Sequence, residues 1–215
     1  MTLARWPVVL FDLDGTVANT IPLILESYAH ATRTVLGRPA PAEETRNWIG
    51  RTLRDTFDAR YPAVSDELLD AYRTWNEANL ERLIRRYDGM AELLADLSDA
   101  GLATGIVTSK RRNPAEATLS GVGLGDSVRL LTAMEDTSRH KPAADPLLHA
   151  LTLLDRRPEE CVYVGDAIYD VRCAAAAGAD AIAVTWGAGS PAELAAENPV
   201  AVVDTVDALR TMLLG

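Results

Sequence analysis

An apolar run that ends in two closely spaced carboxylates stands near the start of the chain. Val8 to Phe11 is followed at once by Asp12-Leu13-Asp14-Gly15-Thr16. Four consecutive apolar residues of this kind predict a buried strand of a parallel sheet. Because open α/β sheets bind ligands outside the carboxyl ends of their strands, Asp12 and Asp14 are expected at the binding edge of such a fold. The alternative is an ordinary turn, which Asp and Gly also favour.

Two later segments carry groups that can bind a phosphate. The apolar run Gly105 to Val107 ends in Thr108 and Ser109. Their hydroxyl groups can donate hydrogen bonds to phosphoryl oxygens, and backbone N–H groups at a following helix start would add to them. Lys141, held before Pro142, offers a compact cation, although a solvated loop lysine is the commoner role.

A further apolar run also ends in acidic residues. Cys161 to Gly165 predicts a strand that delivers Asp166, and Asp170 lies four residues further on, on the same face of a helix that starts there. Asp12 and Asp166 would then face one crevice, and such a cluster of like charges is costly without a cation. Mg²⁺ is the natural choice, because it takes carboxylate and carbonyl oxygens and keeps room for substrate phosphate.

Taken in this order, the four segments resemble the haloacid dehalogenase superfamily, and within it the phosphoglycolate phosphatase-like phosphohydrolases. The resemblance covers nearly the whole chain and rests on these segments: Asp12-Leu13-Asp14-Gly15-Thr16, Val107-Thr108-Ser109-Lys110, Lys141-Pro142 and Gly165-Asp166-Ala167-Ile168-Tyr169-Asp170. It implies a Mg²⁺-dependent hydrolase of a small phosphate monoester that passes through an aspartyl-phosphate. Asn19 and Ala144 depart from the pattern of many relatives, where an acidic residue and a second proline stand.

The resemblance also implies a role for each matched residue. Asp12 would be the nucleophile, and Asp14 the general acid and then the general base. Thr108, Ser109 and Lys141 would hold the phosphoryl group. The implied metal ligands are Asp12, the backbone carbonyl of Asp14, Asp166 and Asp170.

Apolar and polar periodicities predict a doubly wound, mostly parallel sheet. The expected strands are 7–12, 103–108, 128–132, 161–165 and 180–185, with an edge strand at 200–203. The expected helices between them are 89–100, 114–120, 144–154, 168–177 and 191–196. Asn113 is expected to cap the second of these helices.

A long segment that is expected to be helical separates the first two strands of the predicted sheet. Residues 17–86 carry no strand signal and predict helices at 21–36, 42–47, 51–60 and 66–85, with Asn19 as the cap of the first. An all-helical cap domain at 17–86 would lie over the strand ends, while 1–16 and 87–215 would form the α/β core domain. Such lids exclude water and select substrate. Arg51 is the cap residue that could bind a substrate anion, although a solvated arginine at a helix start is an equally common role.

The net charge argues against two classes of partner. The chain has 215 residues and a net charge of −10, which argues against nucleic acid and anionic membranes. Cys161 and Cys173 lie in apolar settings and are expected to be reduced, and the cytoplasm is the expected location. We therefore expect a small phosphorylated metabolite as partner and a monomer or small homo-oligomer.

Other functions remain open at this point. An inorganic pyrophosphatase or a phosphomutase of the same superfamily would use the same core residues. A phospho-accepting receiver domain also uses a strand-end Asp, a hydroxyl, a Lys and Mg²⁺, but the long helical segment and the second carboxylate count against it. His140 lies beside Lys141 and could contact a leaving group, but a loop histidine is more often a bystander. Arg111 and Arg112 follow the predicted Thr108 strand and could line the entrance, but we expect them to be mostly solvated.

Overall fold

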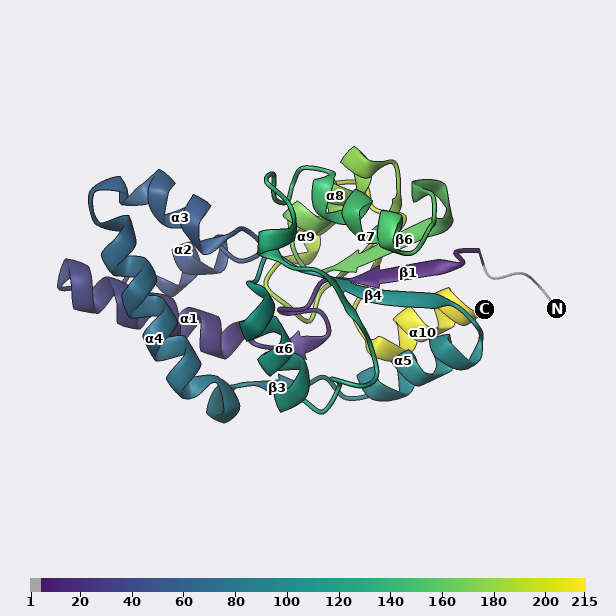
Figure 1. Cartoon of the computed structure of the whole chain (residues 1–215), viewed down its shortest axis with the longest axis horizontal. Helices are drawn as coiled ribbons and strands as arrows, with labels where there is room; N and C mark the ends of the chain where they lie inside the picture. Colours follow the sequence, from purple (N-terminus) through teal and green to yellow (C-terminus); the bar gives the residue numbers. More distant parts are fainter. Residues whose placement is uncertain (1–4) are drawn as a thin grey trace.

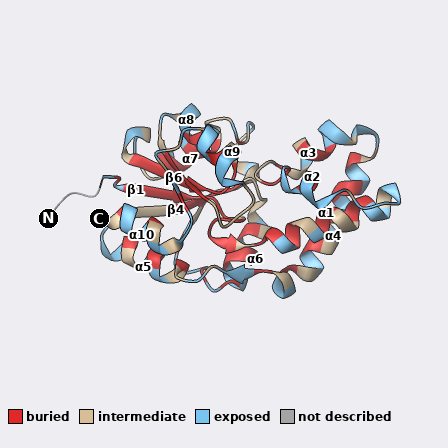
Figure 2. Ribbon diagram, turned by 180° about the vertical axis from the view of Figure 1, so that it is seen from behind, coloured by how far each residue is buried: buried red, intermediate tan, exposed pale blue. Residues whose placement is uncertain are grey.

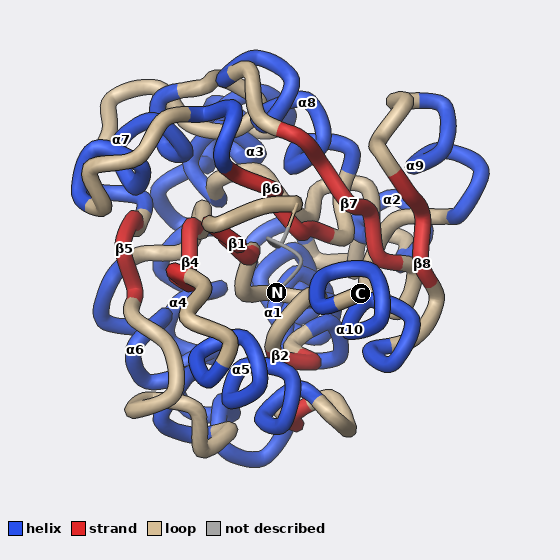
Figure 3. The backbone as a smooth tube through the Cα atoms, turned by 90° about the vertical axis from the view of Figure 1, so that its right-hand side faces the viewer, coloured by secondary structure: helices blue, strands red, loops and turns tan. Residues whose placement is uncertain are grey.

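A computed structural model describes residues 5–215 and centres on one six-stranded parallel sheet. From one edge to the other (Figures 1 and 3), the strands are β5 (Leu130–Thr132), β4 (Ala103–Val107), β1 (Val8–Phe11), β6 (Cys161–Gly165), β7 (Asp180–Val184) and β8 (Ala201–Val203). The chain order reverses direction around β1, which lies between β4 and β6. This arrangement confirms the predicted doubly wound α/β class.

Helices cover both faces of the sheet and build a separate apolar core on each. One core contains side chains of α5 (Met90–Asp99), α6 (Arg112–Gly121) and α10 (Val206–Leu214). The other contains side chains of α7 (Asp145–Leu153), α8 (Ile168–Ala177) and α9 (Pro191–Ala196). Val9 and Phe11 point to the first core and Val8 and Leu10 to the second, so β1 is buried on both sides (Figure 2).

Four helices between β1 and β4 form a helical insertion with an apolar core of its own. They are α1 (Ile21–Leu36), α2 (Ala42–Arg46), α3 (Leu53–Arg60) and α4 (Ser65–Leu83), and they lie beyond the carboxyl ends of the strands (Figure 1). Tyr28 lies at the centre of this core, with its ring 5.0 Å from that of Trp48 and 4.9 Å from that of Tyr72. Edge-to-face packing of these aromatic rings ties α1 to α4 and to the α2–α3 segment.

The insertion joins the sheet through a short antiparallel pair that the sequence pattern does not reveal. β2 (Ala18–Asn19) pairs with β3 (Arg85–Arg86), so the prediction that 17–86 holds no strand was wrong. Two residues are too few to produce a period-2 pattern, and the pairing satisfies backbone groups where the two connections run side by side. Asn19 therefore lies in a strand, and Thr20 precedes α1, so Asn19 does not cap that helix.

Two further expectations need correction at the ends of helices. α6 begins at Arg112 with Arg111 at its N-cap, so Asn113 lies inside the first turn and does not cap. α10 was missed, although Thr205 caps it by accepting a hydrogen bond from the backbone of Ala208. The remaining short helices are η1 (Pro62–Val64), η2 (Met134–Asp136) and η3 (Pro158–Glu160).

Among residues 5–215, no helix combines the length and apolar character that a membrane crossing requires.

Candidate active site

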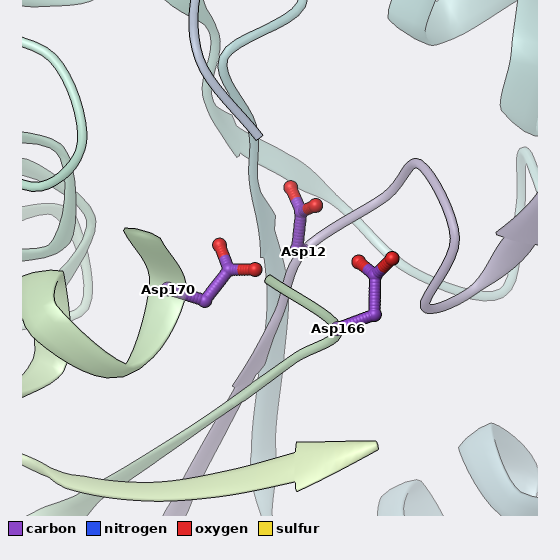
Figure 4. Close-up of side chains that lie close together, drawn as sticks. All are labelled: Asp12, Asp166 and Asp170. Carbon is purple, nitrogen blue, oxygen red and sulfur yellow. The ribbon is translucent and has the colours of Figure 1, made fainter. Parts of the chain in front are cut away.

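Three buried carboxylates meet where β1 and β6 end. Asp12 follows β1, Asp166 follows β6, and Asp170 lies in the first turn of α8. Each offers an oxygen, and these oxygens all lie within 4.8 Å of one another (Figure 4). Parallel pairing of β1 with β6 brings the first two strand ends together, and the turn after β6 adds the third. The structure thus assembles the acidic cluster that the sequence predicted.

Hydrogen bonds from nearby groups hold two of these carboxylates, Asp166 and Asp170, in place. Asp170 Oδ2 accepts a hydrogen bond from the backbone N–H of Ala167 at 3.0 Å, at the start of α8. Asp166 accepts from the hydroxyl of Thr16 at 3.1 Å and from the backbone N–H of Ala188 at 2.6 Å. Gly15 has a φ of +84°, and a Cβ there would overlap the Asp166 carboxylate. Gly15 is therefore suited to this position in two ways: it allows the positive φ of the turn, and it leaves room for the Asp166 carboxylate.

One buried ammonium group is shared between two of the three carboxylates. Lys141 Nζ donates hydrogen bonds to Asp12 Oδ1 and Asp170 Oδ1, each at 2.7 Å, and only 1% of its side chain is exposed. Burial disfavours the charged lysine, but the ion pairs with Asp12 and Asp170 outweigh it and raise the pKa of Lys141. Lys141 is therefore a charged member of the cluster and not a solvated loop residue.

The charge of the cluster is out of balance when all its members are ionised. Burial, followed by the charges of Asp170 and Asp14 but opposed by Lys141, raises the pKa of Asp12 from 3.8 to about 7. Burial and the neighbouring Asp170 and Asp12 raise the pKa of Asp166 well above its ordinary value. Three carboxylates and one ammonium leave two negative charges, and their oxygens suit a hard divalent cation. The residues present thus fit a divalent metal site.

Asp14 lies beside the cluster with a different partner. Lys110 Nζ donates to Asp14 Oδ1 at 2.7 Å, and the two side chains are 12% and 16% exposed. The side chain of Asp14 is not among the three clustered carboxylates. Its predicted ligand role concerned the backbone carbonyl, and its predicted role in proton transfer stays a prediction. Sequence reasoning missed Lys110, although its place directly after Thr108-Ser109 at a strand end was a usable signal.

The two hydroxyl residues after β4 have distinct contacts. Thr108 is buried, and its Oγ1 accepts a hydrogen bond from the backbone N–H of Lys110 at 3.1 Å. Ser109 Oγ donates to the backbone carbonyl of Gly50 at 2.9 Å, across to the helical insertion. Ser109 therefore links the sheet to the insertion in this structure. Its predicted contact with a phosphate stays a prediction.

A cavity of about 100 Å³ lies between the strand ends and the insertion. Asp12, Asp14 and Thr108 line its floor, and Arg51 lines it from the insertion, on the segment between α2 and α3. The structure thus brings Arg51 to the same cavity as the predicted nucleophile. Arg111 also lines this cavity, whereas Arg112 pairs with Asp136 outside it and His140 is not among the lining residues.

Comparisons with known proteins agree with this geometry. The family model for haloacid dehalogenase-like hydrolases matches residues 9–184. Pyrophosphatase PpaX of Bacillus cereus is 34% identical over 205 residues, which cover 95% of each chain. The PpaX of Anoxybacillus flavithermus is 32% identical, with the same 95% of each chain covered.

Solved structures show the same fold. A crystal structure of a predicted phosphatase from Clostridium acetobutylicum superposes with a TM-score of 0.88 at 25% identity, covering 98% of this chain and 99% of that one. A structure of a predicted phosphoglycolate phosphatase from Haemophilus somnus gives a TM-score of 0.84 at 21% identity, covering 97% and 99% of the two chains.

Proposed function

Because the chain belongs to the haloacid dehalogenase-like hydrolases, we propose that it is a Mg²⁺-dependent phosphatase that transfers a phosphoryl group to Asp12 and then to water. The chain is a hydrolase of the phosphatase kind, as its relatives are. The main support for phosphoryl transfer to Asp12 is the set of three buried carboxylates and one buried lysine. This set lies at the strand ends, where Asp12 lines the cavity.

Asp12 and Asp14 divide the chemistry between them. In the first step a carboxylate oxygen of Asp12 forms a bond to phosphorus as the bond from phosphorus to the leaving oxygen breaks, and Asp14 gives that oxygen a proton. In the second step Asp14 takes a proton from water, whose oxygen attacks phosphorus and releases Asp12 and inorganic phosphate. Asp14 lies two residues beyond Asp12 and lines the same cavity, so both groups reach one substrate.

Other residues of the cluster hold the transferred group and its charge. Lys141, Thr108 and Ser109 would orient the phosphoryl oxygens, because phosphoryl transfer depends mainly on positioning and charge neutralisation. Asp12, the Asp14 carbonyl, Asp166 and Asp170 would hold Mg²⁺, which supplies a positive charge that stabilises the phosphoryl oxygens. The helical insertion, as a cap domain over residues 17–86, would exclude water from this reaction.

The proposal includes two substrate classes. A small phosphate monoester is the first, and inorganic pyrophosphate is the second, favoured by the pyrophosphatase name of relatives such as those of B. cereus. A panel of phosphate monoesters and pyrophosphate, assayed for phosphate release with Mg²⁺, tests the proposal. Release from none of them would refute the assigned reaction.

The first mutational prediction concerns Arg51. If its guanidinium binds the far end of an anionic substrate, Arg51→Ala raises KM for that substrate far more than for p-nitrophenyl phosphate, which has no distal anion. A charge-assisted contact is worth about 1.5–3 kcal/mol, so the ratio of the two kcat/KM values changes by roughly tenfold to a hundredfold. Equal losses on both substrates would show that Arg51 supports the fold of the insertion instead.

A second prediction concerns the glycine beside Asp166. A Cβ at Gly187 would overlap the Asp166 carboxylate, and the backbone there does not need a positive φ. Gly187→Ala should therefore displace Asp166 and raise the Mg²⁺ concentration for half-maximal activity by about tenfold or more. Gly125→Ala is the matched control, because its new methyl group makes only ordinary contacts. An unchanged Mg²⁺ requirement in the Gly187 variant would argue against Asp166 as a ligand.

A further inference from the structure

The wall of the cavity carries an excess of positive charge although the chain as a whole is acidic. Its cationic residues outnumber its acidic ones, five to three. The cations are Arg51, Arg54, Arg73, Lys110 and Arg111, and the acidic residues are Asp12, Asp14 and Glu77. The net charge of the chain is −10, so this local excess is opposite in sign to the rest of the molecule.

Most of these cations have carboxylate partners. Lys110 is paired with Asp14 at 2.7 Å, and Arg111 approaches Glu77 at 3.6 Å. Arg54 is paired with Asp66 at 2.7 Å and approaches Asp58 at 3.5 Å. Within residues 5–215, Arg51 and Arg73 are the two cavity-lining cations for which no carboxylate lies within ion-pair distance.

Arg73 is the more unusual of the two. It lies on α4, its Nε is buried, and that N–H has no hydrogen-bond acceptor in the part of the chain that the structure describes. Burial and then the nearby positive charges of Arg111 and Arg54 lower the pKa of Arg73, with Asp70 and Glu77 acting in the opposite direction. A buried N–H donor without an acceptor, in a cavity wall that carries other cations, is costly unless an anion binds there.

We propose that Arg73 and Arg51 together form a second anion subsite, which binds an anionic group on the part of the substrate that leaves with the oxygen. This inference rests on the proposed function, because it requires the phosphoryl group to lie against Asp12 at the other end of the same cavity. The substrate then carries two anionic groups, the phosphoryl group and a second phosphate or carboxylate. Planar guanidinium groups suit either one, because they donate two parallel hydrogen bonds.

The position of the subsite agrees with such a substrate. Arg73 reaches the cavity from α4 and Arg51 from the segment before α3, so both belong to the helical insertion, whereas Asp12 directly follows β1 and Lys141 lies in the loop before α7. A substrate whose phosphoryl group lies against Asp12 and whose second anion binds Arg73 and Arg51 would bridge the strand ends and the helical insertion. Binding of the remote anion would in this way orient the phosphoryl group for attack.

Arg73→Met tests the subsite, because methionine keeps an unbranched apolar stem while removing the charge. The variant is assayed with inorganic pyrophosphate, phosphoglycolate and p-nitrophenyl phosphate. We expect kcat/KM for one or both of the first two to fall at least about tenfold more than for p-nitrophenyl phosphate. A selective loss on pyrophosphate alone identifies the second group as a phosphate, and a loss on phosphoglycolate alone identifies it as a carboxylate.

The matched control is Arg82→Met, on the same helix. Arg82 is exposed, does not line the cavity and bonds to Asn79, so its variant should keep the wild-type ratios. Equal losses on all three substrates in Arg73→Met would overturn the subsite while leaving the phosphatase proposal intact. If the wild type hydrolyses none of these three and no other phosphate monoester of the panel, the proposed function fails. Calorimetric titration with inorganic pyrophosphate then still tests the subsite, which is refuted if Arg73→Met binds as tightly as Arg82→Met.

Discussion

Replacing Asp12 by asparagine is expected to abolish phosphate release while the protein remains folded. The amide keeps the shape of the side chain but lacks the nucleophilic charge, and no other carboxylate in the cluster stands in its place at the end of β1. The loss should exceed about a hundredfold in kcat, as is typical when a nucleophile is removed. Phosphate release from freshly purified protein, checked by mass for deamidation, measures it. Retention of more than about a hundredth of wild-type activity would refute the covalent route.

The same substitution should not destabilise the metal-free protein. The pKa of Asp12 rises from 3.8 to about 7 on folding, so the native state holds more protons than the unfolded state between these values. The contribution of Asp12 to the free energy of unfolding therefore falls as the pH rises through this range. Asparagine does not titrate, so Asp12→Asn removes this pH dependence. Lys141 keeps Asp170 as a partner in the variant. Thermal unfolding in EDTA at pH 5 and pH 8 should show a smaller pH-dependent decrease in Asp12→Asn, and a markedly lower Tm at pH 8 would contradict this account.

Removing the divalent cation should stop the reaction completely, and Mg²⁺ should restore it. The cluster carries two uncompensated negative charges when ionised, so without a cation the phosphoryl oxygens meet repulsion. Ca²⁺ should bind but inhibit, because its larger and more irregular coordination shell misplaces the attacking carboxylate. Phosphate release after EDTA treatment and after addition of each ion measures these effects. Full activity in EDTA would refute the metal roles assigned to Asp166 and Asp170.

A readout independent of turnover separates binding from catalysis. A cation that binds the native state raises the midpoint of thermal unfolding, by an amount that grows with its concentration. We expect Mg²⁺ to raise the Tm of the wild type and to raise that of Asp166→Asn much less. Asp207→Asn, on α10, is a suitable control, because it removes a carboxylate that is not among the clustered residues.

The residues of the acidic cluster could be predicted because the sequence marks them locally. Asp12 and Asp166 directly follow apolar runs, and parallel strands bring such positions to one edge of the sheet. Asp170 follows from the helical spacing after Asp166. In each case a short stretch of chain determines where the carboxylate lies, so the local sequence pattern is sufficient to predict it.

The partners of the cavity residues could not be predicted in this way, because they come from distant segments. Lys110 meets Asp14 across 96 positions, and Ser109 meets Gly50 across 59. Arg73 reads in the sequence as one more polar residue on an amphipathic helix, and only the packing of α4 beside the strand ends places it in the cavity. The two-residue strands β2 and β3 were missed for a different reason, since two residues leave no periodic signal.

The separate apolar core of the helical insertion affects how new substrate preferences can arise in such a protein. Tyr28, Trp48 and Phe57 pack among themselves and not with the cores that support Asp12 and Lys141. Substitutions on the cavity side of α4 or around Arg51 can therefore accumulate while the strand ends keep their geometry. Selection can in this way change which molecule is recognised without rebuilding the apparatus that cleaves it.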